Sequence, residues 1–267
     1  MSLSRIDELF CRLKAQKRLG LFAYVTVGYP DPAAGWELAR MVLDAGADLL
    51  ELGVPFSDPL ADGATIQRAS HRALRAGTRP EHAFELAARL RDAGYEQPLV
   101  VMTYLNPVVA RGEDHFCADL AAAGVDGLII PDLPPDEAGL VGEAARRHGI
   151  DLIFLAAPNS PDDRLRKVAA AATGFIYCVS LTGVTGARDA LAPGLNRFLA
   201  RVRAVSGLPL AVGFGISRPE QVRALRGLAD AVIVGSGLID RVEAAPPEQW
   251  PAVIRSYIGG LRAAGAG

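Results

Sequence analysis

The 267-residue sequence contains very few lysines, and this scarcity limits its chemistry. They stand at positions 14, 17 and 167. Catalysis through a Schiff base requires a lysine that reaches the substrate, in a barrel enzyme normally from the end of a strand. Lys14 and Lys17 lie on or just after the opening helical stretch, and Lys167 lies inside a later one. The sequence therefore argues against Schiff-base catalysis.

Histidine and cysteine are scarce too. They occur at His71, His82, His115, His148, Cys11, Cys117 and Cys178. The histidines fall singly on four helical stretches, and the pattern contains neither H-E-x-x-H nor C-x-x-C, so we expect no metal site. Three widely spaced cysteines are typical of free thiols in a reducing compartment, and we expect a cytoplasmic protein.

The sequence also lacks a basic surplus and a long hydrophobic run. Its net charge of -2 gives no electrostatic footprint for nucleic acid or for an anionic membrane. The longest apolar stretch, around residues 19–29, is too short to span a bilayer, and the charged first 13 residues do not resemble a signal peptide. Because half of the residues are hydrophobic, the chain is expected to be globular.

What the sequence does contain is a repeated unit of a short apolar run, a turn and an amphipathic stretch. The expected strands are Leu21–Val27, Asp48–Leu52, Pro98–Tyr104, Gly127–Ile130, Asp151–Ala156, Gly174–Val179, Pro209–Gly213 and Ala231–Val234. Near-continuous apolar runs are typical of parallel strands buried on both faces. Eight of them alternating with helices predict a single (β/α)₈ TIM barrel over residues 1–267, with a doubly wound sheet as the alternative.

Helix starts support this count. Four spacings predict capping boxes: Ser4-x-x-Asp7, Thr78-x-x-Glu81, Ser160-x-x-Asp163 and Ser217-x-x-Glu220. The first opens a helix that precedes the first strand and carries Ile6, Leu9, Phe10 and Leu13 on one face. We expect this extra N-terminal helix to close the bottom of the barrel.

Two carboxylates stand out once lysine and metal chemistry are set aside. Glu51 lies between leucines in the second expected strand, where burial would raise its pKa toward the range of a general acid. Asp62 lies in the long insertion that follows this strand, and as a member of an Asp-Gly pair it also fits a simple turn or helix cap. Catalytic residues of a barrel lie on the loops that follow the strands, which favours a joint role.

Glycine pairs follow the last three expected strands. Gly183 and Gly186 lie after the sixth, Gly213 and Gly215 after the seventh, and Gly235 opens a helical stretch after the eighth. Backbone N–H groups from such loops and from a helix N-terminus form the usual phosphate site of a barrel.

The sequence resembles the tryptophan synthase alpha chain family over essentially its whole length. The resemblance is carried by LELGVPFSDPLADG at 50–63, TIQ at 65–67, MTYLNP at 102–107, PDLP at 131–134, GVTG at 183–186 and GFGI at 213–216. It implies a (β/α)₈ lyase that cleaves indole-3-glycerol phosphate to indole and glyceraldehyde 3-phosphate by a retro-aldol reaction. The site residues that it implies are catalytic Glu51, Asp62 and Tyr177; indole-pocket Phe22, Tyr104, Ile129 and Phe214; phosphate-binding Gly186, Gly215, Gly235 and Ser236; and mobile-loop Thr185.

The resemblance further implies no cofactor in this chain and a partner beta chain that carries pyridoxal phosphate, in an alpha2beta2 tetramer. Alternatives remain open at this point. The chain can be a stand-alone lyase that releases free indole, a sugar-phosphate isomerase on the same barrel, or a non-catalytic subunit that senses a phosphorylated ligand. Intact Glu51 and Asp62 argue against the last, and the aromatic side chains favour an aromatic substrate.

Overall fold

The computed structural model describes residues 3–180 and 194–267. Eight parallel strands form a closed barrel in sequence order, with the last strand paired to the first, which confirms the predicted fold. The strands are β1 (Gly20–Thr26), β2 (Leu49–Gly53), β3 (Leu99–Met102), β4 (Gly127–Ile129), β5 (Asp151–Ala156), β6 (Ile176–Val179), β7 (Leu210–Gly213) and β8 (Ala231–Val234). The expected boundaries differ from these by at most two residues. The largest differences arise where flanking residues enter turns or caps, as Tyr104 does at the start of a helix.

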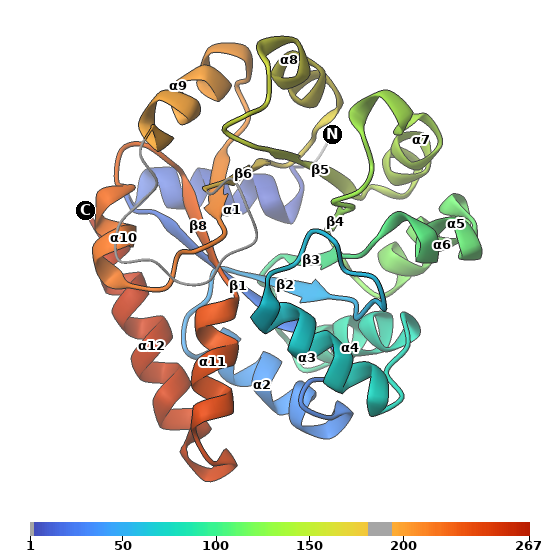
Figure 1. Cartoon of the computed structure of the whole chain (residues 1–267), viewed down its shortest axis with the longest axis vertical. Helices are drawn as coiled ribbons and strands as arrows, with labels where there is room; N and C mark the ends of the chain where they lie inside the picture. The colour runs from blue at the N-terminus through green and yellow to red at the C-terminus, as the bar shows by residue number, and fades with distance from the viewer. Residues whose placement is uncertain (1–2, 181–193) are drawn as a thin grey trace.

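Helices surround the barrel on all sides (Figure 1). They are α1 (Arg5–Ala15), α2 (Pro32–Asp44), α3 (Ala64–Arg75), α4 (Glu81–Asp92), α5 (Leu105–Arg111), α6 (Glu113–Ala122), α7 (Gly139–His148), α8 (Asp162–Ala171), α9 (Leu195–Val205), α10 (Pro219–Ala224), α11 (Ser236–Ala244) and α12 (Trp250–Gly265). Within the described residues, no helix is long and apolar enough to cross a membrane.

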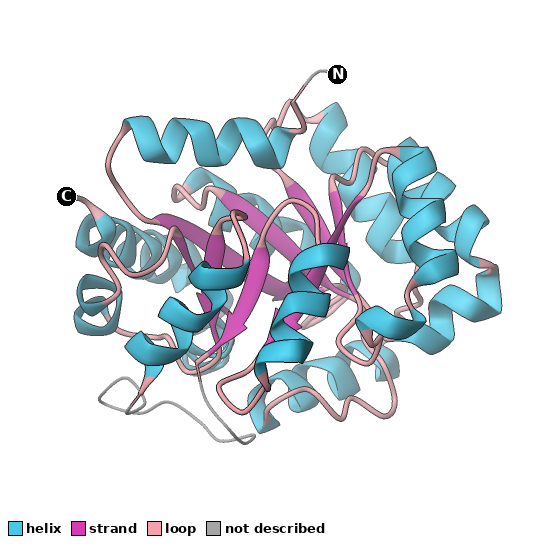
Figure 2. Ribbon diagram, turned by 90° about the horizontal axis from the view of Figure 1, so that it is seen from above, coloured by secondary structure: helices cyan, strands magenta, loops and turns pink. Residues whose placement is uncertain are grey.

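The extra helix α1 closes the end of the barrel where the strands begin (Figure 2). Its apolar face is buried, as the sequence predicts. The ring of Phe10 lies 5.7 Å from that of Phe22 on β1 and 5.9 Å from that of Phe175, which precedes β6. The opposite end of the barrel is thereby left to the loops that follow the strands.

Only one of the four predicted capping boxes forms. Ser4 accepts a hydrogen bond from the Asp7 N–H, and the Asp7 carboxylate accepts one from the Ser4 N–H. The other three predictions are wrong, because α4, α8 and α10 begin later, after Pro80, Pro161 and Arg218. In each case a proline stands within the cap or the first turn, and its fixed φ sets the helix start.

Acidic side chains stabilise the closed end. An aspartate stands directly before each of three strands: Asp48 before β2, Asp126 before β4 and Asp230 before β8. Each carboxylate accepts a hydrogen bond from a backbone N–H near the start of the preceding strand, that of Leu21, Leu99 and Leu210 respectively. Arg18 pairs with Asp48 through two contacts of 2.7 Å, and Arg91 pairs with Asp126 at 2.7 Å. The charged residues at the closed end of the barrel therefore stabilise the fold, and reactive groups are expected at the open end, where the strands end.

Candidate functional site

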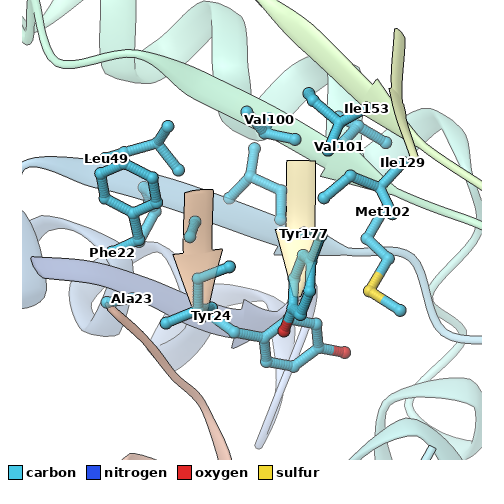
Figure 3. Packing of buried hydrophobic residues seen from close by; sticks show 14 of the residues in the cluster. Phe22, Ala23, Tyr24, Leu49, Val100, Val101, Met102, Ile129, Ile153 and Tyr177 are labelled. Atoms are coloured by element: carbon cyan, nitrogen blue, oxygen red, sulfur yellow. The ribbon is translucent and has the colours of Figure 1, made fainter. Parts of the chain in front are cut away.

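Glu51 lies inside the barrel at its open end. In the parallel register, Tyr24 of β1 is opposite Glu51 of β2, and Glu51 is opposite Val100 of β3. Because side chains alternate along a strand, all three point to the barrel interior, where Tyr24 and Val100 are seen among the packed core residues in Figure 3. The Glu51 side chain is only 2% exposed.

The surroundings of Glu51 favour its protonated form. Its Oε1 atom is buried and has no hydrogen-bond partner among the described residues. Burial, and secondarily the charge of Asp62, raises the pKa of Glu51 to about 8. Burial of an ionised carboxylate without a partner is costly, so Glu51 is a carboxylic acid at neutral pH. The sequence-based expectation of a raised pKa is confirmed.

Asp62 comes from the loop between β2 and α3 and is also buried, with 8% exposure. Burial raises its pKa to about 6, while a hydrogen bond of 3.3 Å from the Tyr104 hydroxyl to Asp62 Oδ2 opposes the rise. The loop that carries Asp62 folds onto the barrel, which accounts for this burial. Asp62 nevertheless remains the stronger acid, so the two carboxyls differ in protonation near neutral pH.

Tyr104 fixes the loop that carries Asp62. Its hydroxyl accepts a hydrogen bond of 3.0 Å from the Ala61 N–H, and its ring stacks on Phe56 at 5.0 Å. From the other side, the Gln67 amide donates to the Asp62 carbonyl at 2.9 Å. The sequence assigns Tyr104 to the pocket wall, and the structure adds that it positions Asp62. Sequence reasoning gave no role to Gln67, although it stands five residues after the aspartate.

Two tyrosines lie in the barrel interior, each against a glycine of the next strand. A Cβ on Gly53 would lie 2.0 Å from the Tyr24 hydroxyl, and one on Gly213 would lie 2.3 Å from that of Tyr177. Figure 3 shows both rings, and burial together with the carboxylate charges raises the pKa of each well above its ordinary value. Both hydroxyls are therefore neutral donors. Strand alternation and the neighbouring Gly53 are the signals that could have identified Tyr24 from sequence.

Phe22 lies away from this group. Phe22 is paired with Leu49 and lies two residues before Tyr24 on β1, which places it nearer to α1 and the closed end. Its ring lies 5.6 Å from that of Phe175. Ile129 is fully buried on β4, opposite Met102 of the neighbouring strand. The structure thus brings Tyr24, and not Phe22, to the level of Glu51, and the pocket role of Phe22 stays a prediction.

The chain after β7 takes an unusual conformation. Phe214 and Gly215 both have positive φ angles, 65° and 81°. Such a conformation is uncommon for a phenylalanine and strained backbone concentrates at functional sites. Phe214 packs edge-to-face on Tyr177 at 5.8 Å, and its carbonyl accepts a hydrogen bond from the Ser180 hydroxyl.

Gly235 and Ser236 form the start of α11, directly after β8, as N-cap and first residue. A Cβ on Gly235 would lie 3.2 Å from the Cβ of Tyr24, so a larger residue here would press on the site. The free N–H groups of a helix start attract anions. Thr185 and Gly186, which the sequence places in the mobile loop and the phosphate site, lie outside the described residues.

The described part of the chain contains no group of three or more His, Cys, Asp or Glu side chains placed to hold a metal ion. The donors at the open end are instead two carboxyls, two buried tyrosines and backbone N–H groups. This set can move a proton, stabilise a positive charge and bind an anion.

Comparison with known proteins shows what the whole chain is similar to. The family model described as "Tryptophan synthase alpha chain" matches residues 10–259. The tryptophan synthase alpha chain of Roseiflexus sp. (strain RS-1) is 53% identical over 97% of this chain and 100% of that protein. That of Chloroflexus aurantiacus is 49% identical over 96% of each. A solved structure of Mycobacterium tuberculosis tryptophan synthase superposes with a TM-score of 0.91 at 39% identity and covers 99% of both chains.

Proposed function

The chain belongs to the tryptophan synthase alpha chain family and is a lyase that cleaves indole-3-glycerol phosphate in tryptophan biosynthesis, and we propose that Glu51, Asp62 and Tyr177 carry out this cleavage. The observation that supports the assignment is a pair of neighbouring buried carboxyls with separated pKa values, about 8 for Glu51 and about 6 for Asp62. A pair of this kind supplies an acid and an anion at one pH.

The proposed reaction uses the two carboxyls in different protonation states. Glu51 donates its proton to C3 of the indole ring, and the positive charge that develops on the ring nitrogen is stabilised by the Asp62 carboxylate. The carbon–carbon bond then breaks, with its electrons returning to the ring. The glycerol hydroxyl becomes the aldehyde as its proton passes to the Glu51 carboxylate. The acid is thereby restored, and no metal or Schiff base takes part.

The remaining predicted residues surround this pair. We place Tyr177, Ile129 and Phe214 around the indole, add Tyr24 at the level of Glu51, and keep Phe22 as a predicted wall residue. Tyr177 is neutral and lies within the field of the Glu51 charge, which suits a donor to substrate or to the carboxylate. The phosphate would bind the N–H groups of Gly215, Gly235 and Ser236, with Gly186 as a fourth contact that stays a prediction.

The family implies a beta-chain partner, and we propose that it docks on the rim beside Asp62 in an alpha2beta2 tetramer. Three large apolar side chains are exposed on successive segments after β2, β3 and β4: Leu60 at 88%, Val109 at 53% and Leu140 at 69%. Large exposed apolar side chains on the segments that follow three neighbouring strands suit an interaction surface. Leu60 stands two residues before Asp62, so docking there would act directly on the reactive loop. Pyridoxal phosphate is expected in the partner alone.

The test measures indole release from indole-3-glycerol phosphate by the wild type, Glu51→Gln and Asp62→Asn, with and without a beta chain. We expect each variant to lose about 100- to 10,000-fold in kcat with little change in substrate affinity. Added beta chain should raise the wild-type kcat at least tenfold, since a misplacement of about 1 Å can cost roughly 100-fold in rate.

Each alternative predicts a different result. Activity of both variants within a few-fold of wild type would refute the assignment. A kcat that stays flat as beta chain is added would identify a stand-alone lyase. Ligand binding without turnover would identify a sensing subunit.

A further inference from the structure

A buried tyrosine without a hydrogen-bond partner lies against the start of α11. Tyr257 of α12 is 8% exposed, and its hydroxyl has no partner among the described residues. A Cβ on Gly237, in the first turn of α11, would lie only 2.5 Å from this hydroxyl. Buried hydroxyls are nearly always hydrogen-bonded, so the orphan donor indicates a group that binds here.

An arginine that forms no ion pair within the described residues stacks on the same tyrosine. The Arg241 guanidinium lies 3.9 Å from the ring centroid of Tyr257, and its Nη1 donates to the Gly237 carbonyl at 2.6 Å. In the described part of the chain, no carboxylate lies within ion-pair distance of Arg241. Stacking and the carbonyl contact hold its positive charge beside the first turn of α11.

The loop after β7 also reaches the first turn of α11, through Ser217. The Cβ that Gly237 lacks would lie 2.9 Å from the Cβ of Ser217. Gln221 secures this loop by accepting from the Ser217 N–H at 2.9 Å and donating to the Gly215 carbonyl at 3.0 Å. The Tyr257 hydroxyl and the Arg241 guanidinium thus lie close to Ser217 and Gly237, each two residues or fewer beyond a proposed phosphate-binding residue.

We propose that Arg241 and Tyr257 complete the phosphate site, with Arg241 supplying its positive charge and Tyr257 donating a hydrogen bond, directly or through water, to the bound anion. The inference rests on the phosphate site of the proposed function and names its side-chain components. The ligand class is a phosphate monoester dianion. A helix start contributes about half a unit of positive charge, and the guanidinium adds a full unit nearby.

The first experiment titrates glycerol 3-phosphate into the full chain by calorimetry at low and at physiological salt. Arg241→Gln keeps an amide donor and removes the charge, and we expect it to weaken affinity about three- to tenfold, more at low salt. Arg241→Lys should stay within about twofold of wild type. Arg255→Gln on the exposed face of α12 is the matched control, and indole, which has no charge, should bind all four proteins alike.

The second experiment compares Tyr257→Phe with wild type by thermal unfolding, with and without glycerol 3-phosphate. Removal of an unsatisfied hydroxyl should leave the Tm of the free protein unchanged or higher. Glycerol 3-phosphate should raise the Tm of Tyr257→Phe less than it raises the Tm of wild type, because a severalfold higher Kd gives less stabilisation at the same ligand concentration. A purely structural hydroxyl would leave that rise intact.

The outcomes separate this inference from the proposed function. If wild type binds glycerol 3-phosphate and both Arg241→Gln and Tyr257→Phe bind it equally well, only the inference is overturned. If wild type itself does not bind, the phosphate site is misplaced and the inference falls with it. An equal loss in Arg255→Gln would show a general charge effect and would also overturn it.

Discussion

The separated pKa values of Glu51 and Asp62 predict a bell-shaped pH dependence of cleavage. The reactive form has Asp62 ionised and Glu51 protonated. With pKa values of about 6 and about 8, about nine-tenths of each group is in the required state at pH 7, so roughly four-fifths of the molecules are reactive. At its ordinary pKa of 4.5, only about 0.3% of Glu51 would be protonated there. The raised pKa therefore enlarges the reactive population about 300-fold.

The assay is kcat/KM for indole release between pH 5 and 9.5 in the presence of saturating beta chain. We expect half-maximal values near pH 6 and pH 8. The substrate phosphate also titrates near pH 6 and could produce the acidic limb by itself.

Tyr104→Phe separates these two causes. It keeps the stacking on Phe56 but removes the hydroxyl that donates to Asp62. Because that hydrogen bond lowers the pKa of Asp62, its loss should move the acidic limb upward in pH, while the substrate phosphate is unchanged. An acidic limb that does not move would show that Asp62 does not set it. Full activity through pH 9.5, or an alkaline limb with its midpoint already near pH 6, would contradict the role of Glu51.

Three further predictions concern stability. Asp48→Ala should destabilise the fold by about 3–5 kcal/mol in urea unfolding and leave kcat unchanged, because it leaves the largely covered Arg18 and the buried Leu21 N–H without their partner; a smaller loss would mean that water solvates Arg18 in the variant. The folded pKa of Glu51, about 8 against 4.5, makes stability fall as pH rises through this window, by roughly 4–5 kcal/mol. Glu51→Gln should therefore be more stable than wild type above pH 8, and equal stability at pH 8.5 would contradict its burial as an acid. Gly213→Ala should destabilise, because its Cβ would lie 2.3 Å from the Tyr177 hydroxyl, and Tyr177→Leu should recover part of that loss in the double variant; strictly additive effects would refute the clash.

The fold was predictable because its signals are local and repeated. Apolar runs such as Asp151–Ala156 and Ala231–Val234 appear as strands with the predicted ends. Helix starts were less predictable, since Thr78 and Ser160 offer cap hydroxyls just before prolines that take the N-cap position instead. Phe22 and Tyr24 both point into the barrel, and Tyr24 was not predicted because the depth of each relative to Glu51 follows from the register with β2, which pairs residues 27 positions apart. No local pattern in the sequence encodes that pairing.

The carboxyls differ in how the chain positions them, and this predicts that Asp62 responds to a beta-chain partner more than Glu51 does. Glu51 belongs to β2, and hydrogen-bonded strands on both sides fix its depth and therefore its pKa. Asp62 belongs to a loop whose position depends on Tyr104 and Phe56 and whose exposed Leu60 faces outward. A beta chain that presses on Leu60 would change the distance between Asp62 and the ring nitrogen and leave Glu51 in place. Partner activation should therefore appear in kcat and in the acidic limb, while the alkaline limb stays near pH 8 with or without the partner.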